Sequence, residues 1–248
     1  MKILLNPDYE PLRSFIETLP ARFAEGKEIH QGRNSIRVFC VDGWELNVKR
    51  YRRPNFLNRL VYTFLRSPKG LRAYRYPQRI LAAGFETPVP VAYMEQRRGG
   101  LIDVSYFVSI QCPYSRRFYE FGNARLTPEV SDIVRSFARF TARLHEAGIL
   151  HLDYSPGNVL FDRVEGEWRF SLVDTNRMYF GSVGMERGCA NFARLWGRPE
   201  WFALLAETYA AERGFDAEAC KRHVMQARRR FWTRYAKRHV VRYELILE

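Results

Sequence analysis

Acidic residues are scarce in this sequence, and one long stretch has none. The 248 residues include 27 Asp and Glu against 40 Lys and Arg, and no carboxylate occurs between Glu45 and Glu86. The resulting net charge of +13 attracts polyanions, which include nucleic acid, anionic lipid and phosphorylated glycans. The charge therefore favours an anionic partner but does not choose among these three.

Long apolar runs and paired cysteines are also missing. No uncharged apolar run reaches the roughly 18 residues of a membrane-spanning helix, and the first apolar run meets Pro7 and Asp8 too early for a signal peptide. The four cysteines are isolated from one another, so neither a zinc motif nor a disulfide framework is supported. We therefore expect a cytoplasmic chain that does not cross a membrane.

The first part of the chain has the pattern of strands. Residues 28–51 contain extended runs, and the Asp42-Gly43 pair between two of them is a strong hairpin signal. Apolar residues then recur at helical spacing over 57–65, and a second helical stretch follows that is interrupted or restarted near Pro77. The apolar runs TPVPVAYME and VSYFVSIQC predict two more strands. Residues 1–110 are therefore expected to form a strand-rich lobe with one or two helices.

The second part of the chain has mainly helical patterns. Thr127-Pro128-Glu129 combines a capping hydroxyl, a proline at the first helical position and an acid in the first turn, which predicts the start of a helix. A short hairpin is expected around Glu165-Gly166, and helices are expected over 199–213 and 216–240. We therefore predict a helical lobe over 111–248.

Residues suited to phosphoryl transfer occur in a consistent order. Lys49 lies on the strand after the predicted hairpin turn, and Asp174 ends the apolar run FSLVD. Between them, HLDYSPGNVLF has the spacing H-x-D-x-x-x-x-N, with the aspartate at 153 and the asparagine at 158. Phosphoryl transfer needs a cation for the nucleotide phosphates, oxygen ligands for magnesium and a carboxylate beside the acceptor hydroxyl. The order favours a catalytic loop over polar residues that merely share a surface turn.

These motifs resemble those of the protein kinase-like superfamily, which carries a strand lysine, an H-x-D-x-x-x-x-N loop and a second aspartate in this order. Within it, LNVKRYRRPNFLNRLVYTFLRSPKGLRAYRY, FETPVPVAYME and VDTNRMYFG are similar to the bacterial lipopolysaccharide core kinases, the Kdo/heptose kinase family. The resemblance covers about residues 28 to 195. It implies an α+β, protein kinase-like two-lobed fold with the active site in the cleft between the lobes.

The resemblance also implies an activity and its cofactors. The protein would use ATP and Mg²⁺ to phosphorylate a sugar hydroxyl, of Kdo or heptose, in the lipopolysaccharide inner core, at the cytoplasmic face of the inner membrane. Lys49 would contact the nucleotide phosphates, and Gly32 would lie in the loop that covers them. Asn158 and Asp174 would hold the magnesium ion.

The resemblance also implies roles for two other residues of the loop. Asp153 would orient the sugar hydroxyl and accept its proton. His151 would be structural and would brace the loop. Arg177 follows the metal-binding aspartate closely enough to meet a phosphate or an anionic substrate.

Two features depart from the family pattern. Arg75 stands where the helix after the lysine strand normally supplies a glutamate, so Lys49 lacks its usual partner. The stretch QGRNS around Gly32 has one glycine where protein kinases have several, which weakens the expected backbone cradle for phosphate. These departures imply either reduced activity or another residue in the missing role.

Other functions are compatible with the same residues. The chain fits a kinase of protein or small-molecule substrates, a non-catalytic nucleotide-binding pseudokinase, or a nucleic-acid-binding module. Residues 46–85 contain ten Lys and Arg, and residues 221–243 contain nine with no acid, which fits RNA, DNA or an anionic membrane surface. The aromatic residues interleaved with these cations, which fit lipid or glycolipid attachment, are Phe56, Phe64, Phe231 and Trp232.

Overall fold

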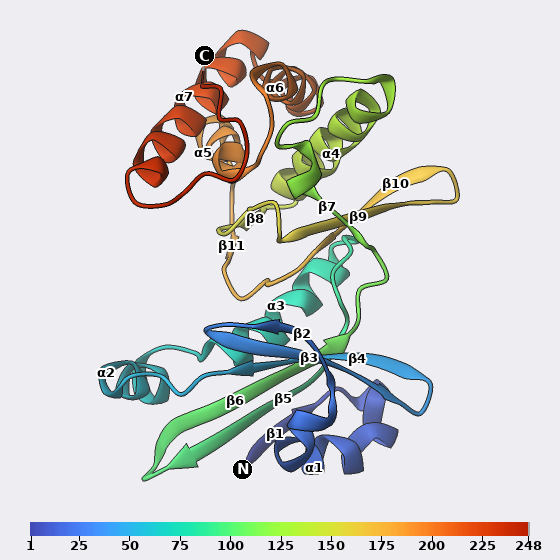
Figure 1. Ribbon diagram of the computed structural model, residues 1–248, viewed down its shortest axis with the longest axis vertical. Coiled ribbons are helices and arrows are strands. Elements are labelled where there is room, and N and C mark those ends of the chain that lie inside the picture. The colour runs from blue at the N-terminus through green and yellow to red at the C-terminus, as the bar shows by residue number, and fades with distance from the viewer. Residues whose placement is uncertain (248) are drawn as a thin grey trace. The chain divides into compact units, whose positions relative to one another are not determined.

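The chain divides into two units, each with its own strands and helices (Figure 1). The structure is a computed structural model, and it describes residues 1–247. Unit 1 consists of Met1–Pro113 together with Asp174–Asn176, and unit 2 consists of Tyr114–Val173 together with the chain from Arg177 onward. The short segment 174–176 therefore belongs to the unit formed by the first part of the sequence.

Unit 1 is built on a six-stranded antiparallel sheet in the order β1-β5-β6-β4-β3-β2. The predicted hairpin at Asp42-Gly43 is confirmed, because both residues have the positive φ that a two-residue type I′ turn requires. The strands are β1 (Lys2–Leu5), β2 (Lys27–Gln31), β3 (Asn34–Val41), β4 (Trp44–Tyr51), β5 (Pro90–Arg98) and β6 (Leu101–Ile110).

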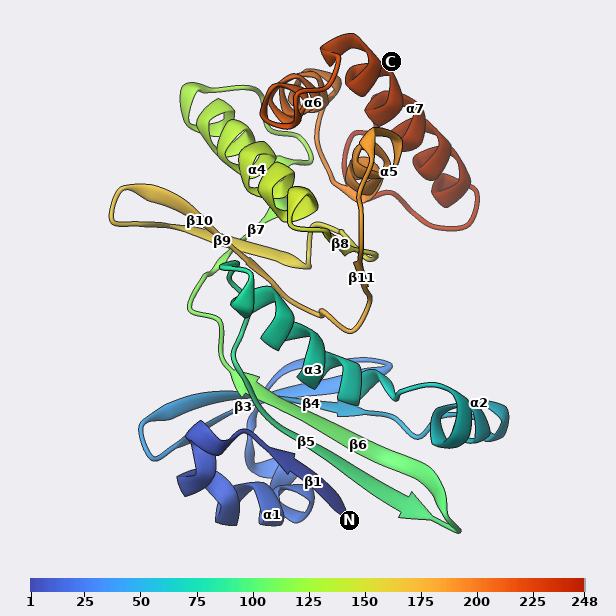
Figure 2. The ribbon, with the colours of Figure 1, turned by 180° about the vertical axis from the view of Figure 1, so that it is seen from behind.

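Two helices cover opposite faces of this sheet (Figures 1 and 2). Helix α1 (Arg13–Arg22), which the sequence did not predict, packs on a face that includes Val48. Helix α3 (Lys69–Ala82) packs on the other face, against Tyr93. Because side chains alternate along a strand, Lys49 projects from β4 on the α3 face.

The remaining helices of unit 1 correct one expectation. Helix α3 runs without a break through Pro77, so the predicted interruption is wrong. Pro77 removes one helical hydrogen bond but is itself buried, and its packing offsets part of that loss. The predicted helix over 57–65 is present as α2 (Phe56–Leu60) and one π-helical turn, η3 (Val61–Leu65). The other short helices are η1 (Pro7–Leu12) and η2 (Phe23–Glu25).

Unit 2 combines helices with two small sheets, in the orders β10-β9-β7 and β11-β8. Helix α4 begins where the sequence predicts, since the Thr127 hydroxyl accepts a hydrogen bond from the Val130 amide at 3.2 Å. The elements are β7 (Arg116–Arg117), η4 (Phe118–Phe121), α4 (Pro128–Glu146), β8 (Ile149–His151), β9 (Val159–Val164), β10 (Glu167–Leu172), β11 (Met178–Phe180), α5 (Met185–Asn191), η5 (Phe192–Arg194), α6 (Pro199–Arg213) and α7 (Ala217–Ala236).

The core of unit 2 is aromatic. Phe118 of η4 packs on three aromatic residues from other elements, which are Phe137 of α4, Phe161 of β9 and Trp201 of α6. The predicted hairpin and the helix over 199–213 are confirmed, whereas the last helix ends at Ala236 rather than near residue 240. Trp232 of α7 is 3% exposed, so it stabilises this unit and is not free to contact lipid.

A buried histidine links the helices of unit 2 to the strand before the candidate loop. His145 Nδ1 lies 2.9 Å from the Tyr209 hydroxyl, and Nε2 lies 3.1 Å from Asn191 Oδ1. The amide oxygen only accepts, so Nε2 carries the proton and Nδ1 accepts from the tyrosine. The Asn191 amide group in turn donates to the carbonyl of His151 at 2.9 Å. The neutral imidazole is thus part of the support for β8.

This network predicts a loss of stability in mild acid. Burial lowers the pKa of His145 from an ordinary 6.5 to about 4. Between these values the unfolded chain binds more protons than the folded one, so the free energy of unfolding falls as the pH falls. We expect a loss of about 2 kcal/mol between pH 7 and pH 5 from this residue alone.

Urea titrations at both pH values would measure this loss. His145→Gln should show a smaller difference between the two pH values, because the amide does not titrate, and the exposed His239→Gln serves as the matched control. An equal pH dependence in the wild type and in His145→Gln would contradict the prediction.

Candidate active site

The residues predicted for phosphoryl transfer are distributed over the two units. Lys49, Asp174 and Gly32 belong to unit 1, whereas Asp153 and Asn158 belong to unit 2. The structure therefore contains two half-sites, which are described separately.

In unit 1 the structure brings together Lys49 and Asp174, which lie 125 positions apart in the sequence. Lys49 Nζ donates to Asp174 Oδ1 at 2.7 Å, and the two side chains are 14% and 36% exposed. Helix α3 contains no acid, and Arg75 on it is exposed. The glutamate that the resemblance would place on this helix is thus absent, as the sequence indicates, but the lysine is paired with an aspartate from a different part of the chain.

Asp174 has an unusual backbone conformation. Its φ is +54°, and the two other non-glycine residues with positive φ among residues 1–247, Asp42 and Glu165, lie in two-residue hairpin turns that require it. Asp174 does not lie in a hairpin turn, so its left-handed conformation costs on the order of 1 kcal/mol or more. The Asn176 side-chain amide donates to the same Oδ1 that accepts from Lys49. Local strain held by side-chain bonds is typical of functional positions.

Tyr51 and Arg72 extend this half-site, and sequence analysis missed both. The Tyr51 hydroxyl and Arg72 Nε are buried and have no hydrogen-bond partner among residues 1–247. Burial and, secondly, the Asp174 carboxylate raise the pKa of Tyr51 well above its ordinary value. Arg72 comes from α3, and burial lowers its pKa, although a guanidinium keeps its charge at neutral pH. Nothing in the sequence separates Arg72 from the other nine cations of the acid-free stretch.

In unit 2 the candidate loop connects β8 to β9, and His151 braces its start. His151 Nδ1 accepts from the Asp153 amide at 3.0 Å, so its Nε2 carries the proton and donates to the Val173 carbonyl at 3.0 Å. The Tyr154 hydroxyl is hydrogen-bonded to Thr141 of α4 at 2.8 Å. These contacts fix the backbone that carries Asp153.

Asn158 completes the loop. Its Nδ2 donates to the Asp153 carbonyl at 2.8 Å, and its own carbonyl accepts from the Val173 amide at 3.0 Å. Because the amide nitrogen is used in this way, Oδ1 is the atom through which Asn158 would ligate a cation.

The donor set suits magnesium held jointly with a nucleotide. No group of three His, Cys, Asp or Glu suited to a metal occurs in residues 1–247. Mg²⁺ in phosphoryl-transfer sites is usually bound by one or two protein oxygens together with phosphates and water. The carboxylate oxygens of Asp174 in unit 1 and the amide oxygen of Asn158 in unit 2 are each of the ligand type that Mg²⁺ prefers.

Both carboxylate oxygens of Asp153 face an arginine. Oδ1 lies 2.5 Å from Arg194 Nη1, and Oδ2 lies 3.5 Å from Arg177 Nη1. Arg177 therefore meets the carboxylate predicted to be the base. Arg194 comes from η5 and carries no sequence signal, since no motif singles it out. The two guanidinium groups place positive charge beside the atoms that would act on the acceptor.

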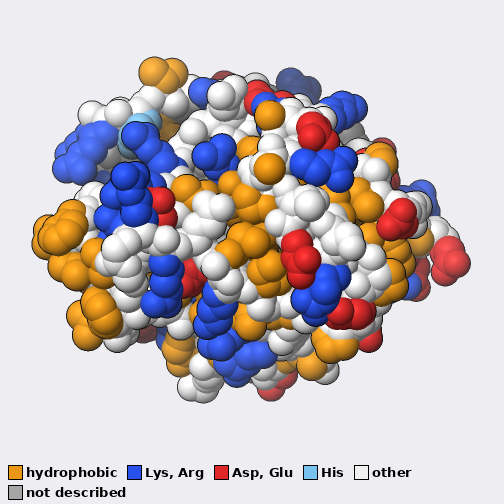
Figure 3. Space-filling view, turned by 90° about the horizontal axis from the view of Figure 1, so that it is seen from below, with side chains coloured by type: hydrophobic (Ala, Val, Ile, Leu, Met, Phe, Trp, Pro, Cys, Tyr) orange, Lys and Arg blue, Asp and Glu red, His pale blue; other side chains and the backbone are white. Residues whose placement is uncertain are grey.

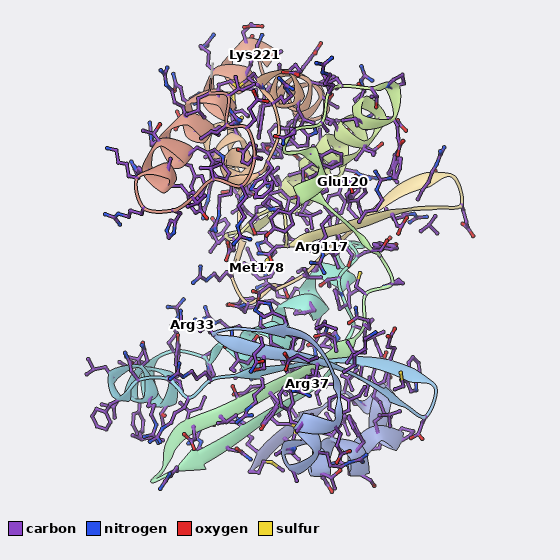
Figure 4. All side chains as sticks on the ribbon, in the orientation of Figure 1. Arg33, Arg37, Arg117, Glu120, Met178 and Lys221 are labelled. Atoms are coloured by element: carbon purple, nitrogen blue, oxygen red, sulfur yellow. The ribbon has the colours of Figure 1, made fainter. Side chains whose placement is uncertain are left out.

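The predicted role of Gly32 stays a prediction. Gly32 is exposed at the tip of the β2–β3 hairpin, and its amide donates to the Asn34 carbonyl at 3.2 Å. It is not among the glycines with positive φ, so the turn conformation does not require glycine there. Its neighbour Arg33 marks the hairpin tip in Figure 4.

Comparisons with known proteins show the fold. No protein-family model and no curated protein matches the sequence. Among solved structures, WaaP in complex with acyl carrier protein matches 96% of this chain and 99% of that one, with a TM-score of 0.62 and 18% sequence identity. In all, 1088 solved chains match, as expected for a fold that supports many activities. The predicted protein kinase-like two-lobed fold is confirmed, with unit 1 as the strand-rich lobe and unit 2 as the helical lobe.

Proposed function

We propose that the protein is an ATP- and magnesium-dependent kinase that phosphorylates a sugar hydroxyl of the lipopolysaccharide inner core, in Kdo or heptose. The observation that carries the proposal is the braced loop of unit 2, in which His151, Asp153 and Asn158 hold one another at hydrogen-bond distance. The fold similarity to WaaP supports the two-lobed fold that such a kinase requires, and the motifs similar to those of the lipopolysaccharide core kinases support this class of substrate.

Each residue contributes binding or proton transfer. Lys49 and Arg72 would bind phosphate oxygens of ATP, and Asp174 and Asn158 would hold the magnesium ion. When bound, the ion neutralises charge on the phosphates. Asp153 accepts a hydrogen bond from the acceptor hydroxyl and takes its proton as the oxygen bonds to the γ-phosphorus. The bond between that phosphorus and the bridging oxygen breaks, and ADP leaves.

The ion pairs of the two half-sites fit this role, because both proposed catalytic carboxylates are paired with cations. Asp174 is paired with Lys49, and Asp153 with Arg194. Binding of ATP and Mg²⁺ would exchange these partners, moving Lys49 to a phosphate and Asp174 to the metal. The carboxylate or phosphate of an acidic acceptor would replace Asp153 as the partner of Arg194 and Arg177. The chain joins the half-sites directly, since Val173 and Asp174 are neighbours.

Transfer of labelled phosphate from ATP would test the proposal. Purified inner-core glycolipid, a general protein substrate and an aminoglycoside would be compared under identical conditions. We expect label in the glycolipid sugar. Label in the protein or the aminoglycoside alone would mean that the kinase acts on another class of acceptor. The absence of both transfer and nucleotide binding would contradict a kinase.

Asp153→Asn should abolish turnover and leave nucleotide binding intact. The amide keeps the shape of the side chain but cannot take the proton, so we expect turnover to fall by at least about 100-fold. The rise in melting temperature with ATP and Mg²⁺ should persist, because that ligand still binds the native state. Asp162→Asn, which changes another aspartate of unit 2, is the control. Full turnover in Asp153→Asn would exclude this residue as the base.

Asp174→Asn should remove the magnesium dependence of ATP binding. An amide is a weaker ligand for Mg²⁺ than a carboxylate, and Lys49 also loses its partner. We expect the metal-dependent part of the ATP thermal shift to disappear. Asp42→Asn is a matched control, because this aspartate also has a positive φ but lies in a hairpin turn. An Asp174→Asn protein that binds ATP with normal magnesium dependence would contradict the assignment.

Arg194→Ala should weaken binding of the acceptor more than binding of ATP. A charge-assisted hydrogen bond contributes about 1.5–3 kcal/mol, so we expect the KM for the glycolipid to rise about tenfold or more. The KM for ATP should stay within about twofold. Arg139→Ala, which removes an exposed arginine paired with Glu212, is the control. A change confined to the KM for ATP would place Arg194 on the nucleotide side instead.

A further inference from the structure

The segment between β4 and α3 turns its apolar side outward. A surface helix normally buries its apolar face and exposes its polar one. Here Phe56, Leu57, Phe64 and Leu65 are 64%, 72%, 72% and 83% exposed. These four residues, which we call the α2–η3 tip, come from two adjacent helical turns.

Polar side chains attach this segment to the sheet. Arg59 is 7% exposed, and it donates to the carbonyls of Ile102 and Arg98, both at 2.8 Å. The Thr63 hydroxyl donates to the Arg59 carbonyl at 2.7 Å and accepts from the Ile102 amide at 3.1 Å. The polar face is thus bound to β6 and to the last residue of β5. The outward direction of the apolar side chains is therefore fixed by hydrogen bonds.

The tip lies within the acid-free stretch. Residues 46–85 contain ten Lys and Arg and no carboxylate, and Arg52 and Arg66 are exposed on either side of the tip. On the face of unit 1 seen in Figure 3, hydrophobic side chains gather at the edge where α2 lies, with Lys and Arg side chains close by. Apolar groups surrounded by cations are the composition of segments that bind anionic lipid interfaces.

We propose that the α2–η3 tip docks the protein on an anionic lipid surface. The four apolar side chains enter the boundary between headgroups and acyl chains, and Arg52 and Arg66 contact the headgroups. Side chains exposed to this degree stand out from the surface rather than line a groove, which suits insertion into lipid better than capture of a peptide. None of the helices in residues 1–247 is long and apolar enough to span a bilayer. The proposal does not depend on the kinase activity.

Co-sedimentation with lipid vesicles tests the proposal on the full chain. Vesicles of phosphatidylcholine alone would be compared with vesicles that contain phosphatidylglycerol as well. We expect binding to the anionic vesicles that weakens with salt. The double variant Phe64→Ser, Leu65→Ser should bind at least about tenfold more weakly, because it loses most of the inserted apolar surface of η3. Arg52→Gln with Arg66→Gln should lose about fivefold per arginine, on anionic vesicles only.

Two controls separate docking from a change in the fold. Val240→Ser removes an apolar side chain of unit 2 that is 84% exposed, and Ile29→Ser removes one of unit 1 that is 48% exposed, and neither residue belongs to the tip. Both should bind vesicles like the wild type. The tip variants should keep the melting temperature of the wild type, because the side chains they change are exposed.

Three results would overturn the proposal. The first is wild-type protein that does not bind anionic vesicles, and the second is a Phe64→Ser, Leu65→Ser variant that binds them as the wild type does. The third is a set of tip variants that bind vesicles like the wild type but lose self-association or binding to a purified acidic acyl carrier protein. That result would assign the tip to a protein partner.

Discussion

The ion pair between Lys49 and Asp174 is the interaction on which the proposed chemistry depends. Lys49 stands on a strand whose neighbouring helix has no acid to offer, and Asp174 supplies the missing negative charge at 2.7 Å. The pair is only partly shielded from water, so its net contribution to stability is modest and its partners can be exchanged. In the proposed function, a triphosphate would replace Asp174 as the partner of Lys49, and a divalent cation would replace Lys49 as the partner of Asp174. A pair of this kind keeps both groups positioned for a ligand that separates them.

The same principle recurs on the acceptor side, with more positive charge. Asp153 is fixed by its backbone contacts to His151 and Asn158, while its carboxylate is held by Arg194 and Arg177. An acceptor without negative charge has no group that could replace the Asp153 carboxylate as the partner of the two arginines. An acidic sugar or a phosphorylated one provides that exchange. The excess of basic residues therefore has a local use in the proposed site in addition to any long-range attraction.

Local patterns predicted the fold better than they predicted contacts. The Asp42-Gly43 turn and the capped start of α4 depend on neighbouring residues only, and both were found from sequence. The partner of Lys49 depends on strand register and on a segment 125 positions away, and Arg194 carries no local signal at all. The helical spacing over 57–65 could be found from the sequence. Whether its apolar side faces the sheet or the solvent could not, because the hydrogen bonds of Arg59 to β6 decide which side faces the sheet. Tertiary contacts therefore set the details of both half-sites.

The most direct test of the central claim is a crystal structure with Mg²⁺ and a non-hydrolysable ATP analogue. The proposed function predicts that Lys49 Nζ bonds to a phosphate oxygen, that Asp174 ligates the metal, and that the 2.7 Å contact between them is lost. A structure in which this ion pair stays intact while the nucleotide is bound elsewhere would contradict it.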